Sequence, residues 1–402
     1  MRAVLSSLGS NGDAQPMLAL AAELRRSGHD AVVALSPNFE RRVKDMGIDF
    51  VRTGPVLPED AIRSVITAQM QNRRPAAQVR QFLEASLPSL PGMYRSLLQT
   101  CQNADILIGS PYQLACRMVH ESTSIPYVSL HLSQFAELGG RECQVVSAGL
   151  INPYRKQEGL PPLDDPLGTD GRSTELALYA VSRHLLKVPP QWPTHCKVVG
   201  FFFLEEQAWQ PTVALREFCE AGEAPVVITF GSVVYDDPKP VTHLLRDAVE
   251  LAGCRAIIQN GWGGVGNGIV SDGIYTCGYA PHSWLFPKAA LVVHHGGAGT
   301  TASTFRSGVP SLIVPHTLDQ PIWAEFARAK GCARSVIPFS HLNSARLAAT
   351  IKGSLGSPQI YEAAAAFGDQ IRQERGVEAA RELLENLMDS RRGAFVPSTS
   401  NV

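Results

Sequence analysis

One sequence pattern occurs twice in this chain and limits the folds that it can adopt. The apolar run AVLSSLGS at 3–10 ends in a Gly-Ser turn, and PVVITFGS at 225–232 repeats this arrangement. After the first turn, Met17 and Leu24 fall on one face of a predicted helix, and DAVVAL at 30–35 is typical of another strand. Strand, turn, helix and strand form the unit of a parallel sheet with crossover helices. Two separate starts predict an α/β protein with two Rossmann-like, doubly wound domains that face each other across a cleft.

The other predicted elements divide the chain into parts. Residues 60–100 have a helical pattern interrupted by prolines, and the Pro-, Gly- and Asp-rich segment 150–172 is expected to be a loop. Further strands are predicted at 104–110, 127–132, 256–259, 273–278, 290–295 and 311–315. We expect an N-terminal domain at 1–203, a C-terminal domain at 204–375, and a helix and tail at 376–402 that can pack back on the first domain. Open α/β sheets bind ligands at the carboxyl ends of their strands, so we expect the chemistry in the interdomain cleft.

Charge and composition exclude several classes of function. The 402-residue chain has a formal net charge of −1, which gives no electrostatic footprint for nucleic acid or an anionic membrane. Its eight cysteines show neither C-x-x-C nor zinc-finger spacing, and no apolar run approaches the length of a transmembrane segment. Glycines and polar residues break the apolar run at the N-terminus too early for a signal peptide. We therefore expect a cytoplasmic enzyme, as a monomer or homodimer, that binds no nucleic acid.

A glycine-rich turn follows a predicted strand of the second half. The strand ALVVHH at 290–295 and the helix TASTFRSG, for which Gly308 is the expected stop, enclose Gly-Gly-Ala-Gly at 296–299. Glycines let backbone N–H groups approach an anion closely, and the unpaired N–H groups at the start of the following helix add to this attraction. The turn therefore suits a diphosphate, with His295 and Thr300 as further donors. A tight turn that binds nothing is the alternative, because short glycine-rich motifs occur by chance.

Longer stretches around this turn resemble a known family. LFPKAALVVHHGGAGTT at 285–301 and PSLIVPHTLDQPIWAE at 310–325 resemble the donor-binding region of family 1 glycosyltransferases, which have the GT-B fold. Three more segments resemble the subgroup that includes sterol glucosyltransferases and the glycosyltransferases of glycopeptide and macrolide antibiotic pathways. These segments are APHSWLF at 280–286, GFFFLEEQAWQP at 200–211 and LGSNGDAQPMLALAAELRRSGH at 8–29. The resemblance implies that the first domain binds the acceptor and the second binds a nucleotide sugar.

The resemblance also implies roles for single residues of the second domain. Those expected to contact the donor diphosphate are His295, Gly297, Gly299, Thr300 and, from the opposite side, Ser232. Those expected to hold the nucleoside are Tyr279, Ala280 and His282, and those expected to hold sugar hydroxyls are Asp319 and Gln320. Many relatives carry Trp where Tyr279 stands and Gln where His282 stands, so packing of the tyrosine ring is an alternative to base stacking. For Asp319 the alternative role is a helix cap.

A single carboxylate is the candidate catalytic group of the first domain. Asp13 stands in Gly-Asp-Ala-Gln-Pro at 12–16, where most of the wider family has a catalytic histidine and the resembled subgroup has aspartate. The resemblance implies that Asp13 is the base for the acceptor hydroxyl, and Ser110 stands near the position of the family's orienting aspartate. A helix cap is the alternative role for Asp13. The implied reaction is an inverting, metal-independent transfer of a hexose or deoxyhexose from a UDP- or dTDP-sugar, with no bound cofactor.

The acceptor and the rival functions stay open on the sequence alone. Apolar pieces within 51–150 are expected to line the acceptor pocket, which favours a lipophilic alcohol such as a sterol, polyketide or macrolide, but they also suit helix cores. A sugar-nucleotide epimerase on the same fold would need no acceptor pocket, and a non-catalytic nucleotide-sugar-binding partner would need no base. A Rossmann oxidoreductase is disfavoured because the glycines within 9–12 lack the full G-x-G-x-x-G pattern.

Overall fold

Two mainly parallel sheets form the framework of the protein. The computed structural model describes residues 1–394 except 57, 59–63, 66, 71, 73, 134–139, 189, 207–208, 232, 234, 236 and 260–267. The strands of the first sheet, in spatial order, are β3 (Asp49–Arg52), β2 (Asp30–Leu35), β1 (Arg2–Ser6), β4 (Ile106–Gly109), β5 (Tyr127–His131), β6 (Leu176–Tyr179) and β7 (Cys196–Val198). Those of the second are β10 (Gly268–Ser271), β11 (Ile274–Cys277), β9 (Ala256–Gln259), β8 (Val226–Thr229), β12 (Leu291–His294), β13 (Ser311–Ile313) and β14 (Ala333–Val336). Within these described strands, only the pairing of β10 with β11 is antiparallel.

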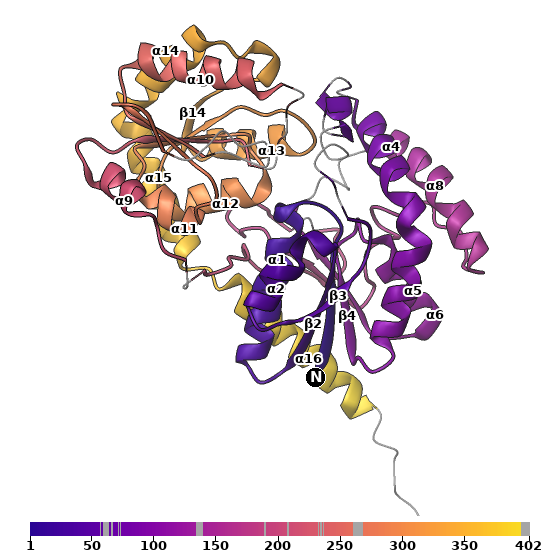
Figure 1. The fold of residues 1–402 in the computed structure, drawn as a ribbon. Coiled ribbons are helices and arrows are strands. Elements are labelled where there is room, and N and C mark those ends of the chain that lie inside the picture. The colour runs from indigo at the N-terminus through magenta and orange to yellow at the C-terminus, as the bar shows by residue number, and fades with distance from the viewer. Residues whose placement is uncertain are drawn as a thin grey trace, which may run out of the picture.

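Helices cover the two sheets, and each sheet with its helices forms one lobe of the molecule. The helices of the first half are α1 (Asn11–Arg26), α2 (Glu40–Asp45), α4 (Pro75–Ser86), α5 (Leu90–Cys101), α6 (Leu114–Thr123) and α8 (Gly140–Gln157). Those of the second half are α9 (Val213–Glu220), α10 (Pro238–Ala252), α11 (His282–Leu285), α12 (Ala298–Ser307), α13 (Gln320–Ala329), α14 (Ser344–Leu355), α15 (Pro358–Arg372) and α16 (Gly376–Ala394). Figure 1 shows the first half, from indigo to magenta, beside the mainly orange second half. The predicted α/β fold with two doubly wound sheets is confirmed.

The alternation of side chains along a strand explains why each sheet is covered on both faces. In β1, Leu5 packs with Met17 and Leu24 of α1, whereas Val4 points to the other face and packs with Leu83 of α4 and its neighbours. Both faces of a parallel sheet are buried in this way, which requires strands that are apolar along their whole length. The last four residues of β1 and all of β4 are buried accordingly.

The predicted strands are present, and one helical segment differs from prediction. β2 and β9 have the predicted ends, and the other predicted strands lie within their expected ranges. Prolines divide the helical pattern of 60–100 as predicted: Pro75 and Pro91 stand in the first turns of α4 and α5, where no intrahelical N–H is needed, and Pro88 lies in the short 3-10 turn between the two helices. The expected loop at 150–172 is wrong in its first part, because α8 continues to Gln157 with Pro153 inside it. Burial of Ile151 in the core overrides the local breaker signal.

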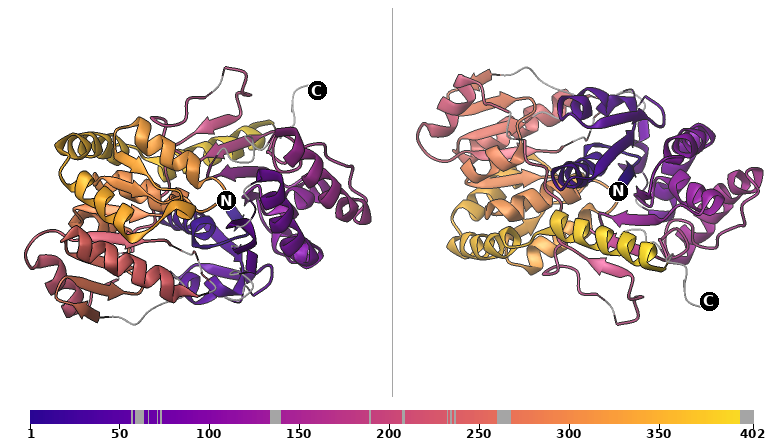
Figure 2. Two further views of the ribbon diagram at one scale, coloured as in Figure 1. Left: turned by 90° about the horizontal axis from the view of Figure 1, so that it is seen from above. Right: turned by 90° about the horizontal axis from the view of Figure 1, so that it is seen from below.

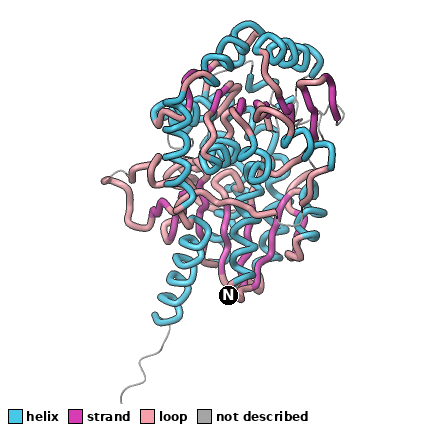
Figure 3. The backbone as a smooth tube through the Cα atoms, turned by 90° about the vertical axis from the view of Figure 1, so that its left-hand side faces the viewer, coloured by secondary structure: helices cyan, strands magenta, loops and turns pink. Residues whose placement is uncertain are grey.

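The last helix returns to the first lobe. Leu384 and Met388 of α16 belong to the same core cluster as Leu5 and Met17. At its surface, His29 Nε2 lies 2.8 Å from Glu385 Oε1. Figure 2 shows this yellow helix running along the first lobe in the view from below, and Figure 3 shows it beside the strands of that lobe. The exact domain boundaries at 203 and 375 stay predictions.

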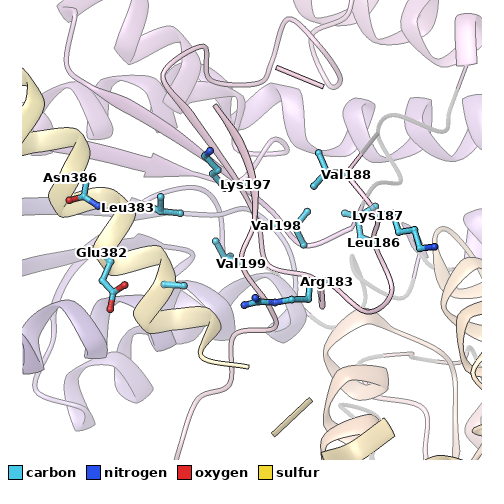
Figure 4. Close-up of a pocket in the computed structure, with 11 residues that line it drawn as sticks. Arg183, Leu186, Lys187, Val188, Lys197, Val198, Val199, Glu382, Leu383 and Asn386 are labelled. Carbon is cyan, nitrogen blue, oxygen red and sulfur yellow. The ribbon is translucent and has the colours of Figure 1, made fainter. Parts of the chain in front are cut away.

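A surface cavity lies where α16 passes the edge strand β7. It has a volume of about 620 Å³ and is lined by Val198 and Val199 of the strand segment and by Leu383 of the helix. Figure 4 shows Glu382, Leu383 and Asn386 of α16 beside the segment that carries Lys197, Val198 and Val199. The cavity is built from segments of the first lobe and α16, and it contains none of the predicted site residues. Among the described helices, none is long and apolar enough to span a membrane.

Candidate active site

A larger cavity of about 1200 Å³ lies where the carboxyl ends of the two sheets face each other. Both strand-to-helix turns predicted to carry the chemistry line it, which is the expected ligand position in open α/β sheets. The predicted site residues that line it are Asp13, Tyr279, Ala280, His282, His295, Gly297, Gly299, Thr300, Asp319 and Gln320. Ser232 lies outside the described residues. The fold thus brings residues from both ends of the sequence into one space.

The glycine-rich turn leaves the start of α12 open to a ligand. Gly297 occupies the N-cap position, and no side chain caps the helix among the described residues, so the first N–H groups of α12 have no capping acceptor. Gly296 has a φ of +90°, and a Cβ there would lie 2.9 Å from Ile313 Cγ2. A Cβ on Gly297 would overlap Nε2 of His295. A Cβ on Gly299, in contrast, would meet no protein atom within 4 Å, so this position borders open space.

Burial keeps the histidines of this turn neutral at neutral pH. It lowers the pKa of His295 to about 4, although the nearby Thr229 carbonyl favours the charged form. The His295 ring is enclosed by glycine, because a Cβ on Gly231 would lie only 2.7 Å from its Cε1. His294 accepts a hydrogen bond at Nδ1 from Gly296 N, and burial holds its pKa well below the usual value. His294 is therefore a packing residue, and His295 is a neutral imidazole beside the open turn.

The predicted nucleoside residues form a wall with one exposed ring. Tyr279 is 54% exposed, and its hydroxyl donates a 2.6 Å hydrogen bond to Glu206 Oε2. Arg42 of α2 forms an ion pair with the same Glu206, so the tyrosine is linked to the first lobe. Ala280 is buried and its carbonyl accepts a hydrogen bond from Gln259 Nε2 at 2.8 Å. Tyr279 therefore lines the cavity with its hydroxyl already bound, and the Arg42 guanidinium lies over its ring, with Cζ 5.8 Å from the ring centroid.

His282 has a different setting. Its ring stacks on Phe286 with centroids 4.2 Å apart, and burial lowers its pKa to about 4. Because the ring lines the cavity in neutral form, it can donate or accept one hydrogen bond without carrying charge.

The acidic-amide pair has part of its hydrogen-bonding capacity in use. Asp319 stands at the N-cap position of α13, but its side chain does not cap the helix. Its Oδ2 accepts instead from Trp323 Nε1 at 2.8 Å. Oε1 of Gln320 accepts from the backbone N–H of His316 at 2.7 Å and of Thr317 at 3.2 Å. The hydrogen bonds described for Gln320 thus use its oxygen, so its amide nitrogen is the atom left to meet a ligand.

On the opposite side of the cavity, Asp13 is held by the first turn of α1. The N-cap of that helix is Ser10, and Asp13 completes a capping box three residues later, with Ser10 N donating to Oδ2 at 2.8 Å. A Cβ on Gly9, whose φ is +139°, would overlap the same oxygen. Burial raises the pKa of Asp13 to about 6, the Ser10 hydrogen bond opposes this, and the Asp319 carboxylate adds to it. The two carboxylates are thus electrostatic neighbours across the cavity.

Several cavity residues have no signal in the sequence. Gln78 of α4 is 5% exposed and donates from Nε2 to Thr317 Oγ1 at 2.9 Å, which joins the two lobes. Tyr112 packs edge-to-face on Phe82, with centroids 5.3 Å apart. Ser110, by contrast, was expected from the resemblance near the position of the family's orienting aspartate, and it is buried in the cavity wall. These contacts depend on segments that meet only in the folded chain, so periodicity and motif spacing could not reveal them.

Three kinds of group therefore meet in this cavity. Its first-lobe side offers a carboxylate with a raised pKa, and its second-lobe side offers uncapped helix N–H groups beside a neutral imidazole. This combination can accept a proton on one side and stabilise an anion on the other. In the described part of the chain, no three His, Cys, Asp or Glu side chains come together as a metal site.

Two family descriptions match separate parts of the chain. Residues 3–136 match the glycosyltransferase family 28 N-terminal domain. Residues 256–385 match the C-terminal domain that is described as erythromycin biosynthesis protein CIII-like. Each match covers part of one sheet, and each includes one of the two turns at the cavity.

Several known proteins are similar to this chain over nearly its whole length. The chain is 30% identical to O-mycaminosyltylonolide 6-deoxyallosyltransferase of Streptomyces fradiae, over 99% of this chain and 100% of that enzyme. It is 29% identical to a sterol 3-beta-glucosyltransferase of Arabidopsis thaliana, over 94% of this chain but 64% of that enzyme. The spinosyn rhamnosyltransferase solved with thymidine diphosphate has a TM-score of 0.70 at 21% identity, over 96% of this chain and 100% of that one.

Proposed function

Since this chain belongs to the glycosyltransferases of the GT-B fold, in the group of the sterol glucosyltransferases and antibiotic glycosyltransferases, we propose that it moves a hexose or deoxyhexose onto a lipophilic alcohol. The donor in this proposal is a UDP- or dTDP-sugar. The observation that carries it is the single cavity with Asp13 on one side and the open glycine-rich turn on the other. The acceptor lobe comprises 1–203 and the donor lobe 204–375, and α16 supports the acceptor lobe, whereas the tail at 395–402 lies outside the described residues.

The donor diphosphate occupies the turn before α12. Uncapped backbone N–H groups and the positive end of the helix dipole attract it, and Thr300 adds a hydroxyl group. His295 donates a hydrogen bond from its neutral ring, so its contribution does not depend on a proton gained from solvent. Thymidine diphosphate is the ligand of the similar spinosyn enzyme, which supports a nucleoside diphosphate at this place.

The base and sugar lie on either side of this anion. Tyr279, Ala280 and His282 hold the nucleoside, with the exposed tyrosine ring as the stacking surface. The Asp319 carboxylate accepts hydrogen bonds from sugar hydroxyls, and the Gln320 amide nitrogen donates to one. A sugar that lacks a matching hydroxyl leaves one of these buried groups unpaired, which is how such a site selects its donor.

Transfer is a direct displacement with inversion at the anomeric carbon. The acceptor oxygen forms a bond to that carbon while the bond from the carbon to the diphosphate oxygen breaks. Asp13 accepts the proton of the acceptor hydroxyl, and the negative charge of the bond-breaking electron pair goes to the diphosphate at the helix N-terminus. A carboxylate with a pKa of about 6 is a stronger base than an exposed aspartate and is still ionised at neutral pH.

The acceptor lies on the first-lobe side of the cavity. Leu8, Val79 and Phe82 line this part of the wall, and apolar side chains favour an apolar molecule there. The names of the relatives give O-mycaminosyltylonolide and sterols as the molecules they act on, which supports a lipophilic alcohol for the present chain. The chain spans about two thirds of the length of the Arabidopsis enzyme. Because that enzyme is named for a sterol, a sterol is one member of the acceptor panel below.

The test is a panel of purified protein with several UDP- and dTDP-sugars and mixed lipophilic alcohols, read by mass spectrometry. The proposal expects a product whose mass exceeds that of an acceptor by one hexose or deoxyhexose residue. A parallel reaction without acceptor, followed by NMR, separates transfer from the epimerase alternative. An epimerised donor, or no mass gain with any pair, would overturn the proposed transfer.

A further inference from the structure

The loop before α13 contains a leucine in an unusual backbone conformation. In the described part of the chain, Ser124 and Leu318 are the non-glycine residues with positive φ, and that of Leu318 is +53°. This conformation is unfavourable for residues with a Cβ, which crowds the neighbouring carbonyl. Ser124 is the C-cap of α6, where left-handed residues are common. Leu318 ends no helix, so its conformation requires a different explanation.

Both sides of the leucine are fixed by hydrogen bonds. The Gln320 oxygen receives the backbone N–H groups of His316 and Thr317, which closes the loop on the start of α13. The Thr317 hydroxyl accepts from Gln78 of the first lobe at 2.9 Å. These contacts hold the backbone on either side, so Leu318 keeps a conformation that it would leave in a free loop. Strained residues that the surroundings fix in this way cluster at functional sites.

The side chain of Leu318 is placed at the cavity. It is 36% exposed although it is large and apolar, and it lines the same space as Asp13 and Phe82. The next residue is Asp319, whose carboxylate is the electrostatic neighbour of Asp13 and Tyr112. The donor lobe therefore contributes an apolar side chain to the cavity that Asp13 and Asp319 also line, and the preceding Thr317 is hydrogen-bonded to α4, the helix that supplies Val79 and Phe82 to the cavity wall.

From this placement, we propose that Leu318 is the contact that the donor lobe makes with the apolar body of the acceptor, and that it determines acceptor specificity. The inference rests on the proposed function. An acceptor held by both lobes covers Leu318 and removes its apolar surface from water, which explains why an exposed leucine is kept in a strained turn. The acceptor is then an alcohol with apolar surface close to the reacting hydroxyl.

The test measures the side-chain contact by acceptor affinity and the backbone strain by Tm. Asn and Gly adopt left-handed conformations readily, so Leu318→Asn and Leu318→Gly remove the apolar side chain and relieve the strain together. Leu251→Asn on α10 is the matched control, since Leu251 is 55% exposed and does not line the cavity. For each protein we measure Tm, the Kd of UDP and dTDP, the KM of an acceptor from the panel, and the Kd of dehydroergosterol by its fluorescence.

We expect Leu318→Asn to raise the acceptor KM and the dehydroergosterol Kd about tenfold, with an equal or higher Tm and nucleotide affinity within twofold of the parent. Leu251→Asn leaves both acceptor values unchanged. A lower Tm with an unchanged acceptor KM would show a packing role and overturn the inference.

The two proposals fail in different ways. Weaker binding of dehydroergosterol by Leu318→Asn, in a protein that transfers no sugar, would uphold the leucine contact and overturn the transferase proposal. Sugar transfer with an unchanged KM and unchanged probe affinity would do the opposite. A parent protein that neither binds the probe nor modifies any acceptor would overturn both.

Discussion

The turns β1–α1 and β12–α12 have the same backbone arrangement but present groups of opposite charge preference to the cavity. In each, an apolar strand leads through a glycine with positive φ, Gly9 at +139° and Gly296 at +90°, into a helix at the cavity. In the first turn, Ser10 and Asp13 close the helix start with a capping box. In the second, Gly297 stands at the N-cap and no described side chain caps the helix. One turn presents a carboxylate and the other presents unpaired N–H groups.

This difference shows how one supersecondary unit can serve two partners in a reaction. Unpaired N–H groups at a helix start attract an anion, whereas a capping carboxylate both satisfies such groups and repels an anion. Whether the helix start is capped by a carboxylate or left open to an anion depends on a few residues after the strand. The strand and the helix are of the same type in both turns. The following changes act on one turn or the other and are ordered by the size of the expected effect.

Removal of the carboxylate from the first turn has the largest expected effect. Asp13→Asn keeps an oxygen that can accept from Ser10 N, so the capping box persists while the base is lost. We expect kcat to fall by about a thousandfold with nucleotide Kd within a few fold of the parent, measured by steady-state kinetics and calorimetry. A kcat close to that of the parent would remove Asp13 from the role of base.

Added methyl groups in the second turn distinguish packing from ligand space. Gly297→Ala places a Cβ into the His295 ring, so we expect a lower Tm together with roughly a hundredfold weaker donor binding. Gly299→Ala meets no protein atom, so we expect an unchanged Tm and about tenfold weaker donor binding, because the methyl group enters the phosphate space. Thermal melts and calorimetry with UDP and dTDP measure both. Full donor affinity in Gly299→Ala would place the diphosphate elsewhere.

The pH dependence of the reaction reports on the first turn. Asp13 acts when ionised, and its pKa is raised to about 6, so kcat/KM is expected to fall about tenfold per pH unit below that value. His295, with a pKa lowered to about 4, stays neutral over this range and adds no second step above pH 5. Rate profiles between pH 4.5 and 8 provide the measurement. A flat profile from pH 5 to 7 would contradict ionisation of a buried carboxyl as the controlling event.

The smallest expected effect is on stability, and its sign follows from the same carboxyl group. The folded pKa of about 6 lies above the ordinary aspartate pKa of 3.8, so the folded state binds the proton more tightly and stability is lost as pH rises through about 6. Asp13→Asn removes this loss and is expected to raise the free energy of unfolding by about 1–2 kcal/mol at pH 8. Below pH 3.8 the gain disappears, which denaturant titrations at pH 8 and 3.5 can test.

Much of this arrangement was predictable because it is local. The strands at 30–35 and 256–259 have the predicted ends, since their boundaries are set by polar and glycine residues next to apolar runs. The helix after the glycine-rich turn was likewise visible in the sequence, although it begins at Ala298 rather than after Gly299. Asp13 was expected as a catalytic group or an N-cap, and the structure shows that Ser10 is the N-cap and Asp13 the N3 residue of the box.

Contacts between distant segments could not be predicted. Gln78 and Thr317 are 239 positions apart, and their hydrogen bond depends on how the two lobes meet. The hydrogen bond from Tyr279 to Glu206 also joins residues that are far apart in the sequence. The left-handed conformation of Leu318 was not predicted either. Leucine is a poor indicator of a left-handed turn, so only the folded chain could reveal that conformation. The continuation of α8 through Pro153 was also missed, because burial of its apolar face outweighs the local propensity.

The return of α16 to the first lobe has a consequence for synthesis of the protein. Leu384 and Met388 share a core with Leu5 and Met17, so the lobe made first by the ribosome lacks part of its interior until the final helix has emerged. A nascent chain that extends only to residue 375 exposes to solvent the apolar side chains of α1 that α16 later covers. The N-terminal lobe thus completes its folding last, even though translation produces it first.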